Sequence, residues 1–266
     1  MSALDDEIRD LLRFAAERSI LPRFRNLADD EIIEKAEDDL VTVADRETEE
    51  FLTEALEKLA PGVPVVGEEA VHADPTVADR LKGPCWIIDP IDGTHNFAAG
   101  KGPFGTIIAL ADGGETIAGW IYDPQTQRLC HAKRGEGAFV NGEQITAQAT
   151  GENPPIAAIS LIFLDEEQRE ATKRHLAPHY RMVDIPRCAA EQYPRLALGV
   201  NDISVFKRTL AWDHATGVLW LNEAGGKAAR PDGSAYRVDE HDRIGLIGAA
   251  SPALFDELAE RIAGLA

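Results

Sequence analysis

The feature of this 266-residue chain that most constrains its fold is a change of pattern near residue 150. Before it, across 106–140, short β-prone runs are separated by turn sequences such as Asp112-Gly113-Gly114, which is typical of antiparallel sheet. After it, strand-like and helix-like runs alternate, which indicates a sheet covered by helices. The sequence therefore predicts an α/β (α+β) protein in two halves, 1–150 and 151–266, that meet at the Pro-containing stretch 150–155.

The individual elements are predicted from the spacing of apolar residues and from turn signals. We expect helices from Leu4 to before Pro22, at 51–59, 165–176, 188–198 and 209–224, and after Ser251-Pro252. We expect strands at 63–66, 86–88, 107–110, 116–122, 128–132, 138–140, 156–163, 182–185, 202–206 and 244–247. Asp45 stands where a helix would need its N-cap, so it has a structural interpretation beside any catalytic one.

The composition disfavours several kinds of partner. The chain has 46 Asp and Glu against 27 Lys and Arg, and its net charge of −19 argues against nucleic acid and anionic membranes. Its three cysteines, Cys85, Cys130 and Cys188, are far apart and indicate neither a disulfide framework nor a zinc site. The acidic start lacks a signal-peptide pattern, and no run reaches the roughly 18 apolar residues of a membrane span. We therefore expect a cytoplasmic protein.

The strongest chemical signal lies in the stretch from Trp86 to Phe97. Its apolar beginning predicts a buried strand, which delivers Asp89 and Asp92 into a Pro/Gly turn just before the hydroxyl of Thr94. Gly93 has no Cβ, so the backbone N–H groups of Gly93 and Thr94 can face an anion. The pattern is that of a metal and phosphate site, although an ordinary solvated turn fits the same dipeptides.

Two further acids have the chemistry to complete such a site. Glu68 follows a predicted strand and Asp213 lies near a predicted helix start, where surface charge or a helix-dipole role is the plainer interpretation. If both converge with Asp89 and Asp92, their oxygen ligands suit magnesium, manganese or calcium. Two such ions about 3.5–4 Å apart can clamp a phosphate and activate water, which indicates metal-dependent phosphoryl transfer to water. His214 has no Cys or His at ligand spacing and receives no role.

A rival interpretation starts from the same turn. The haloacid-dehalogenase-like phosphatases use Asp-x-Asp-Gly-Thr, with a covalent aspartyl nucleophile. Here the spacing from Asp89 to Asp92 and Thr94 is one residue longer, which disfavours a phosphoenzyme.

Several segments together resemble the inositol monophosphatase family of lithium-sensitive, magnesium-dependent sugar-phosphate phosphatases. The matching segments occur in family order over most of the chain: Asp39-Leu40-Val41-Thr42 with Asp45, Gly67-Glu68-Glu69, Asp89-Pro90-Ile91-Asp92-Gly93-Thr94 with Asn96-Phe97, Gly137-Ala138-Phe139 with Asn141-Gly142, and Trp212-Asp213-His214-Ala215-Thr216-Gly217 with Glu223-Ala224-Gly225-Gly226. The resemblance implies a layered αβαβα sandwich and a homodimer. It also implies a small phosphorylated substrate such as inositol 1-phosphate.

The resemblance implies a ligand set for two or three Mg²⁺ ions. Glu68, Asp89 and the backbone carbonyl of Ile91 would bind the first ion, whereas Asp89, Asp92 and Asp213 would bind the second, and Glu68 could reach a third. Mn²⁺ is a possible substitute, and Ca²⁺ or Li⁺ would inhibit.

The resemblance also implies the catalytic and substrate-binding residues. The nucleophile would be a metal-activated water oriented by Glu68 and by Thr94, whose hydroxyl pairs with Asp45. The N–H groups of Gly93 and Thr94 would hold the phosphate. The implied substrate-binding residues are Asp92, Gly93, Thr94, Arg187 and Asp213.

The chain departs from the family pattern where the alcohol part of the substrate would bind. Phe206 replaces an acid that holds sugar hydroxyls, Arg187-Cys188-Ala189 replaces a Gly-Ser/Thr-Ala segment, and His95 replaces a frequent threonine. These changes leave histidinol phosphate open as a substrate, and Arg187 with Lys207 could meet a second phosphate, as in fructose 1,6-bisphosphate or a nucleotide 3′,5′-bisphosphate. A non-catalytic protein that binds cations or sugar phosphates is the alternative of another class.

Overall fold

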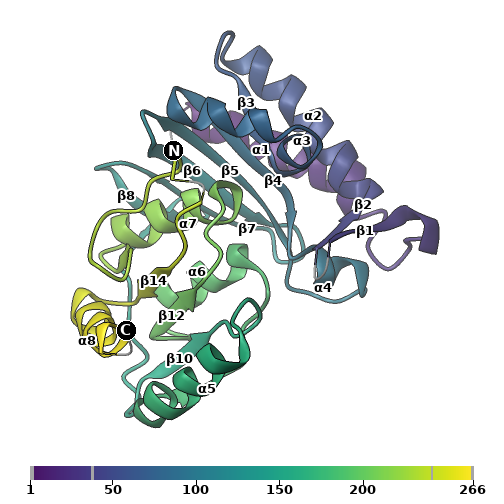
Figure 1. Cartoon of the computed structure of the whole chain (residues 1–266). Coiled ribbons are helices and arrows are strands. Elements are labelled where there is room, and N and C mark those ends of the chain that lie inside the picture. The colour runs from purple at the N-terminus through teal and green to yellow at the C-terminus, as the bar shows by residue number, and fades with distance from the viewer. Residues whose placement is uncertain (1–2, 37–38, 241, 265–266) are drawn as a thin grey trace.

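The computed structural model describes residues 3–36, 39–240 and 242–264, and it consists of five alternating layers of helix and sheet (Figure 1). The helices are α1 (Ala3–Ala15), α2 (Val43–Leu59), α3 (Glu68–Ala73), α4 (Thr94–Ala98), α5 (Glu166–His175), α6 (Ala189–Ala197), α7 (Ala211–Glu223) and α8 (Pro252–Ala263). The strands are β1 (Ile32–Ala36), β2 (Asp39–Thr42), β3 (Val65–Gly67), β4 (Cys85–Asp92), β5 (Gly105–Asp112), β6 (Glu115–Asp123), β7 (Arg128–Lys133), β8 (Gly137–Val140), β9 (Glu143–Ile145), β10 (Ile156–Ile159), β11 (Arg181–Met182), β12 (Ile203–Phe206), β13 (Lys227–Ala229) and β14 (Leu246–Ala249).

The larger sheet has seven strands, in the order in which they occur along the chain from β3 to β9. The pair β3–β4 is parallel, and every later neighbour is antiparallel. The antiparallel series predicted from the turn sequences is therefore present. Strand β9 was not predicted, because the sequence places the end of the antiparallel series at the Asn141-Gly142 turn.

The smaller sheet has five strands in the order β11-β10-β12-β14-β13. Its strand β10 pairs in parallel with both β11 and β12, whereas β14 runs antiparallel to its neighbours. Sequence reasoning missed β13 and β1, whose alternation is too short to stand out from the surrounding polar residues. The run Leu40-Val41-Thr42-Val43 suits a short strand or turn, and most of it lies in β2, which pairs with β1 in a hairpin.

The apolar faces of these elements explain the layers. Helices α1 and α2 cover one face of the larger sheet, with Ile8 and Leu52 in one cluster with Trp86 and Trp120. Helices α6 and α7 lie between the two sheets, and α7 is buried along most of its length. The outer face of the smaller sheet packs on α8 through Phe255. The predicted αβαβα sandwich is confirmed.

Some predicted boundaries are wrong. The strand expected at 156–163 ends at Ile159, and the one expected at 182–185 is only Arg181–Met182. In the sequence, the 150–155 stretch separates the strands of the larger sheet from those of the smaller sheet. Helix α7, which comes after this stretch, nevertheless packs on the larger sheet. The division into two halves therefore stays a prediction.

Candidate active site

The two aspartates of the Trp86–Phe97 stretch lie within β4, at the end of the strand rather than beyond it. The pairing of β4 with β5 is regular from Cys85 to Asp89, and it shifts register before resuming at Asp92 opposite Gly105. An irregularity of this kind re-aims side chains at the end of a strand. Asp89 and Asp92 thereby face the same cavity.

Four acids from separate parts of the chain line this cavity, which has a volume of about 170 Å³. Asp89, Asp92 and Asp213 each offer a carboxylate oxygen, and these oxygens lie within 4.8 Å of one another. Glu68, the first residue of α3, also lines the cavity. The tertiary structure therefore brings together all the carboxylates that the sequence singled out as metal ligands.

The electrostatics of this cluster fit divalent cations. The pKa of Asp89 is raised well above its ordinary value, first because burial desolvates the carboxylate and then because Glu68, Asp92 and Asp213 repel its charge. Burial also raises the pKa of Asp92. Oδ1 of Asp89 is buried and has no hydrogen-bond partner among the described residues. An orphaned oxygen among like charges is costly unless a cation compensates it, so the residues present fit hard metal ions.

Asp45 is not the N-cap of α2, as its position suggested, but the third residue of the first turn. The N-cap is Thr42, and the two side chains form a capping box in which Oδ2 of Asp45 accepts from the Thr42 N–H at 2.8 Å. Its other oxygen, Oδ1, lies 3.5 Å from the hydroxyl of Thr94. That hydroxyl makes a shorter bond, 2.9 Å, to the backbone carbonyl of Ile91. Metal binding by the Ile91 carbonyl stays a prediction.

Gly93 connects β4 to α4 in a conformation that other residues rarely adopt. Its φ is +86°, and a Cβ there would lie 2.9 Å from the carbonyl oxygen of Pro103 and 3.2 Å from Cβ of Cys188. The close approach of Cys188 brings α6 to the turn, where the N–H of Ala190 donates to Oδ2 of Asp92 at 2.5 Å. A glycine is therefore required for both the turn and the docking of α6.

Glu49 is a functional candidate that sequence reasoning missed. It lies on α2 and is only 7% exposed, and its carboxylate accepts from the N–H groups of Glu69 (2.9 Å) and Ala70 (2.8 Å). A Cβ on Gly67 would meet this carboxylate at 2.2 Å. Glu49 thus fixes the first turn of α3, which carries Glu68. The available signal was an acid on the buried side of an otherwise amphipathic helix.

We expect Glu49→Gln to raise the Mg²⁺ concentration needed for half-maximal activity by about threefold or more, because one of the two accepting oxygens becomes an NH2 group, which cannot accept an N–H bond. Initial rates over a Mg²⁺ titration measure this. Glu50→Gln is the matched control, since Glu50 is the exposed neighbour on the same helix. Equal Mg²⁺ dependence in both variants would contradict the positioning role.

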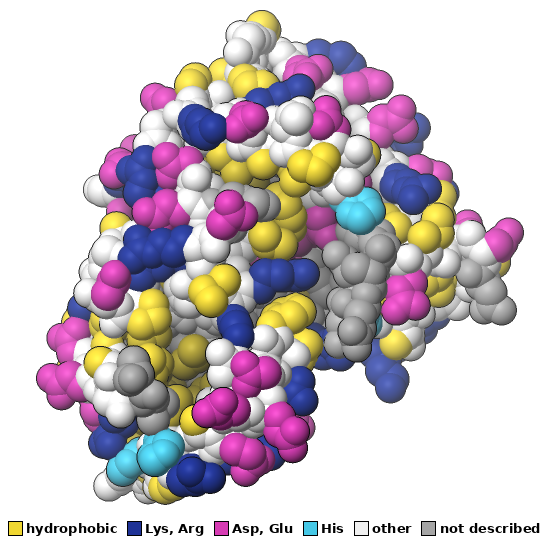
Figure 2. Space-filling view, viewed as in Figure 1, with side chains coloured by type: hydrophobic (Ala, Val, Ile, Leu, Met, Phe, Trp, Pro, Cys, Tyr) yellow, Lys and Arg dark blue, Asp and Glu magenta, His cyan; other side chains and the backbone are white. Residues whose placement is uncertain are grey.

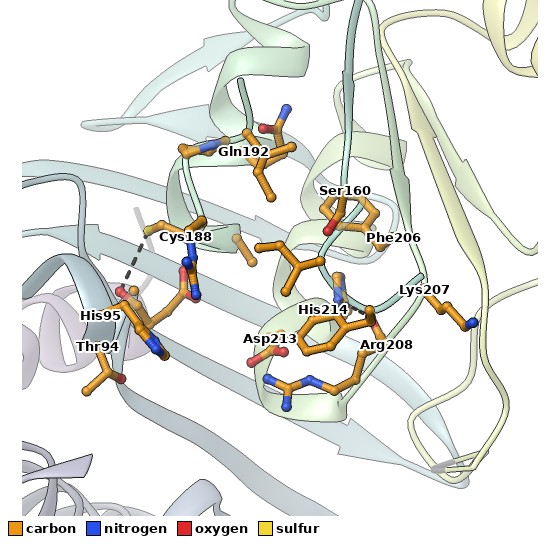
Figure 3. A pocket seen from close by; sticks show the side chains of 18 of the residues that line it. Thr94, His95, Ser160, Cys188, Gln192, Phe206, Lys207, Arg208, Asp213 and His214 are labelled. Carbon is orange, nitrogen blue, oxygen red and sulfur yellow. Dashed lines mark hydrogen bonds between the residues drawn. The ribbon is translucent and has the colours of Figure 1, made fainter. Parts of the chain in front are cut away.

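The other residues that the sequence singled out around the substrate also line the cavity. Arg187 is exposed, lines the cavity and has a left-handed backbone with φ +52°. Phe206, at the end of β12, and His95, on α4, line it too. Figure 3 shows Thr94 and His95 on one side of the opening, and Phe206, His214 and Asp213 on the other.

Comparison with known proteins places these features in context. The model of the inositol monophosphatase family matches residues 6–264. The inositol-1-monophosphatase of Bacillus subtilis is 33% identical over 214 residues, which cover 77% of this chain and 78% of that protein. The histidinol-phosphatase of Chlorobaculum parvum is 32% identical over 200 residues, 74% of each chain. The crystal structure of the extragenic suppressor protein suhB from Bartonella henselae superposes with a TM-score of 0.82 at 25% identity, covering 98% of both chains.

The fold and the acidic cavity define a phosphatase of the layered αβαβα type, a class of phosphoric monoester hydrolase that acts on small phosphorylated substrates. Within that class, the chain belongs to the inositol monophosphatase family, since the family model spans nearly its full length.

Proposed function

We propose that the protein is a Mg²⁺-dependent phosphatase that hydrolyses a small phosphate monoester, similar to inositol 1-phosphate, by direct attack of water. The observation that carries this proposal is the meeting of Asp89, Asp92 and Asp213 around a buried, unpartnered oxygen. Glu68, Asp89, Asp92 and Asp213 are the proposed ligands, together with the Ile91 carbonyl. Two or three ions, with Mn²⁺ as a substitute and Ca²⁺ or Li⁺ as inhibitors, follow from the family.

The proposed mechanism divides the work among these residues. Bound divalent cations would lower the pKa of a water molecule and neutralise the charge that develops on the departing alcohol. Glu68 and Thr94 orient the attacking water, and Asp45 orients the Thr94 hydroxyl. The N–H groups of Gly93 and Thr94 hold the phosphate, and Asp92, Arg187 and Asp213 contact the rest of the substrate. No aspartyl-phosphate forms, because the two aspartates of β4 bind cations.

Asp92→Asn tests the proposal directly. The asparagine oxygen can still accept from the Ala190 N–H, so we expect a folded protein whose phosphate release falls by more than about 100-fold. Circular dichroism checks the fold, and release of phosphate from an aryl phosphate, with and without Mg²⁺, measures turnover. Near-normal turnover of the variant at saturating Mg²⁺ would refute the assignment.

The same experiment separates this function from the alternative of another class, a non-catalytic protein that binds cations or sugar phosphates. The presence of every proposed carboxylate in one cavity supports the enzyme. Among the named substrates, histidinol phosphate stays a second candidate, because a relative at 32% identity bears that activity in its name.

We also propose a cytoplasmic homodimer with no nucleic-acid or membrane partner, on the basis of family and charge. Within the described ranges no helix is long and apolar enough to cross a membrane. Size-exclusion chromatography with light scattering tests the dimer.

A further inference from the structure

The wall of the cavity opposite the β4 turn is aromatic where the family pattern has an acid. Phe206 lines the cavity, stacks on Tyr193 (ring centroids 5.5 Å apart) and meets the His214 ring edge-on at 4.8 Å. The four acids named above are the only acids that line the cavity in the described part of the chain, and three of them form the metal cluster. The outer part of the cavity therefore offers no carboxylate to hold the hydroxyls of a polyol.

His214 holds this aromatic wall in place. Its ring is buried and has a hydrogen-bond partner at each nitrogen. Nε2 faces the backbone carbonyl of Arg208 at 3.1 Å, and a carbonyl can only accept, so Nε2 carries the proton. Nδ1 therefore accepts from the hydroxyl of Tyr193 at 2.8 Å. Both ring nitrogens are used, which fixes Phe206 and the backbone of Arg208 beside Asp213.

A positive charge lies next to the aromatic wall. The guanidinium of Arg208 sits 4.7 Å over the ring of Phe163, and both residues line the cavity. Among the described residues no carboxylate forms an ion pair with Arg208. In Figure 2, Lys and Arg side chains border the hollow in the middle of this face, although the chain as a whole carries a net charge of −19. A cation held at a cavity mouth without a paired acid favours an anionic ligand.

A buried acceptor completes this half of the cavity. Gln192 is 3% exposed and lines the cavity, and its amide nitrogen donates to Ser204 at 2.7 Å. Its Oε1 is buried without a partner in the described residues. Figure 3 places Gln192 at the end of the cavity away from Thr94 and Asp213. A donor on the ligand would satisfy this oxygen.

We infer that Phe206 and Arg208 determine specificity, and that the preferred substrate is a phosphate ester whose alcohol carries both a flat unsaturated ring and a second anionic group. This inference rests on the proposed phosphatase function and narrows it. Phe206 packs against the ring, Arg208 pairs with the second anion, and a polyol finds no carboxylate in the outer part of the cavity, within the described residues, to accept from its hydroxyls. A cationic alcohol such as histidinol is repelled by Arg208.

Four esters separate the two features. Adenosine 3′,5′-bisphosphate has the ring and the second anion, adenosine 3′-monophosphate has only the ring, fructose 1,6-bisphosphate has only the anion, and inositol 1-phosphate has neither. We expect kcat/KM to be highest for adenosine 3′,5′-bisphosphate and lowest for inositol 1-phosphate. The ring and the second anion should each raise kcat/KM by about tenfold or more. Histidinol phosphate should also fall below adenosine 3′-monophosphate.

Two variants assign the features to residues. Phe206→Glu should lower kcat/KM for both adenosine esters by about tenfold and raise it for inositol 1-phosphate. Arg208→Met should reduce the ratio of kcat/KM between adenosine 3′,5′-bisphosphate and adenosine 3′-monophosphate, which measures the effect of the second anion. It should leave the ratio between adenosine 3′-monophosphate and inositol 1-phosphate, which measures the effect of the ring. Lys173→Met is the control, because this substitution also removes one positive charge, but outside the cavity. Lys173 is an exposed residue on α5 that pairs with Glu170.

The outcomes distinguish this inference from the proposed function. Mg²⁺-dependent hydrolysis of an aryl phosphate combined with a preference for inositol 1-phosphate would overturn the inference and leave the function intact. If no ester is hydrolysed, the function fails, and calorimetric binding of adenosine 3′,5′-bisphosphate against inositol 1-phosphate still decides the inference. Equal or reversed affinities, or the same selectivity in Phe206→Glu as in the wild type, would overturn it.

Discussion

Asp89→Asn is expected to abolish Mg²⁺-dependent phosphate release and, in the absence of metal, to raise the melting temperature. Activity should fall by more than about 100-fold, since Asp89 is the one carboxylate proposed to touch both ions, and even outer-shell partners of metals are worth 10–100-fold. Stability should rise because the asparagine removes a buried charge that Glu68, Asp92 and Asp213 repel. The two effects have opposite signs, as expected for a residue that serves metal binding at a cost to folding.

The same residue gives a pH dependence whose sign follows from its raised pKa. Between the ordinary carboxyl pKa near 4 and the raised value, folded Asp89 binds a proton that the unfolded chain releases. Without metal, the stability of the wild type therefore falls as the pH rises through this window. Added Mg²⁺ should reduce that loss, because the cation favours the ionised form.

Thermal unfolding in EDTA and in Mg²⁺, at a series of pH values, measures both effects. Glu136→Gln is the control, since it removes one exposed charge outside the cavity. If the metal-free Asp89→Asn protein is less stable than the wild type, the prediction is contradicted. That result would show that protein partners stabilise the Asp89 carboxylate without a cation.

Gly93→Ala is expected to lower the free energy of unfolding by about 2–5 kcal/mol and to remove most activity. A left-handed backbone costs an alanine about 1–2 kcal/mol, and overpacking adds about 1–3 kcal/mol. The clash is with the Pro103 carbonyl, which is backbone and cannot rotate away, and with Cys188. Displacement of Cys188 would move α6 and the Ala190 N–H that holds Asp92.

Gly62→Ala separates the two costs. Gly62 has φ +90°, close to the +86° of Gly93, but a Cβ there meets nothing within 4 Å. Its substitution should cost only about 1–2 kcal/mol and leave turnover unchanged. Urea unfolding and phosphate release are measured for Gly93→Ala and Gly62→Ala. Equal losses of unfolding free energy would mean that the close approach of α6 to Gly93 contributes nothing to the cost of the substitution.

Much of the fold was readable because its signals are local. Turn dipeptides mark the hairpins of the larger sheet, and the 3.6-residue period marks α1 and α8. Short strands such as β11 and β13 carry too few residues to show a period, and their pairing partners are distant in sequence. Asp45 shows the same limit, because its position suggested an N-cap, whereas the structure makes Thr42 the N-cap and Asp45 the third residue of the capping box.

The sequence by itself determined the chemistry of the candidate site: which oxygens are available, that a glycine follows Asp92, and that the family's metal-binding segments occur in order. Only the tertiary structure decided that Asp89, Asp92 and Asp213 meet within 4.8 Å, that Glu49 holds the turn of Glu68, and that an aromatic wall faces them. The physical reason is that ligand type is a property of single residues, whereas a raised pKa, an orphaned oxygen and a cavity wall arise from packing between segments far apart in the chain.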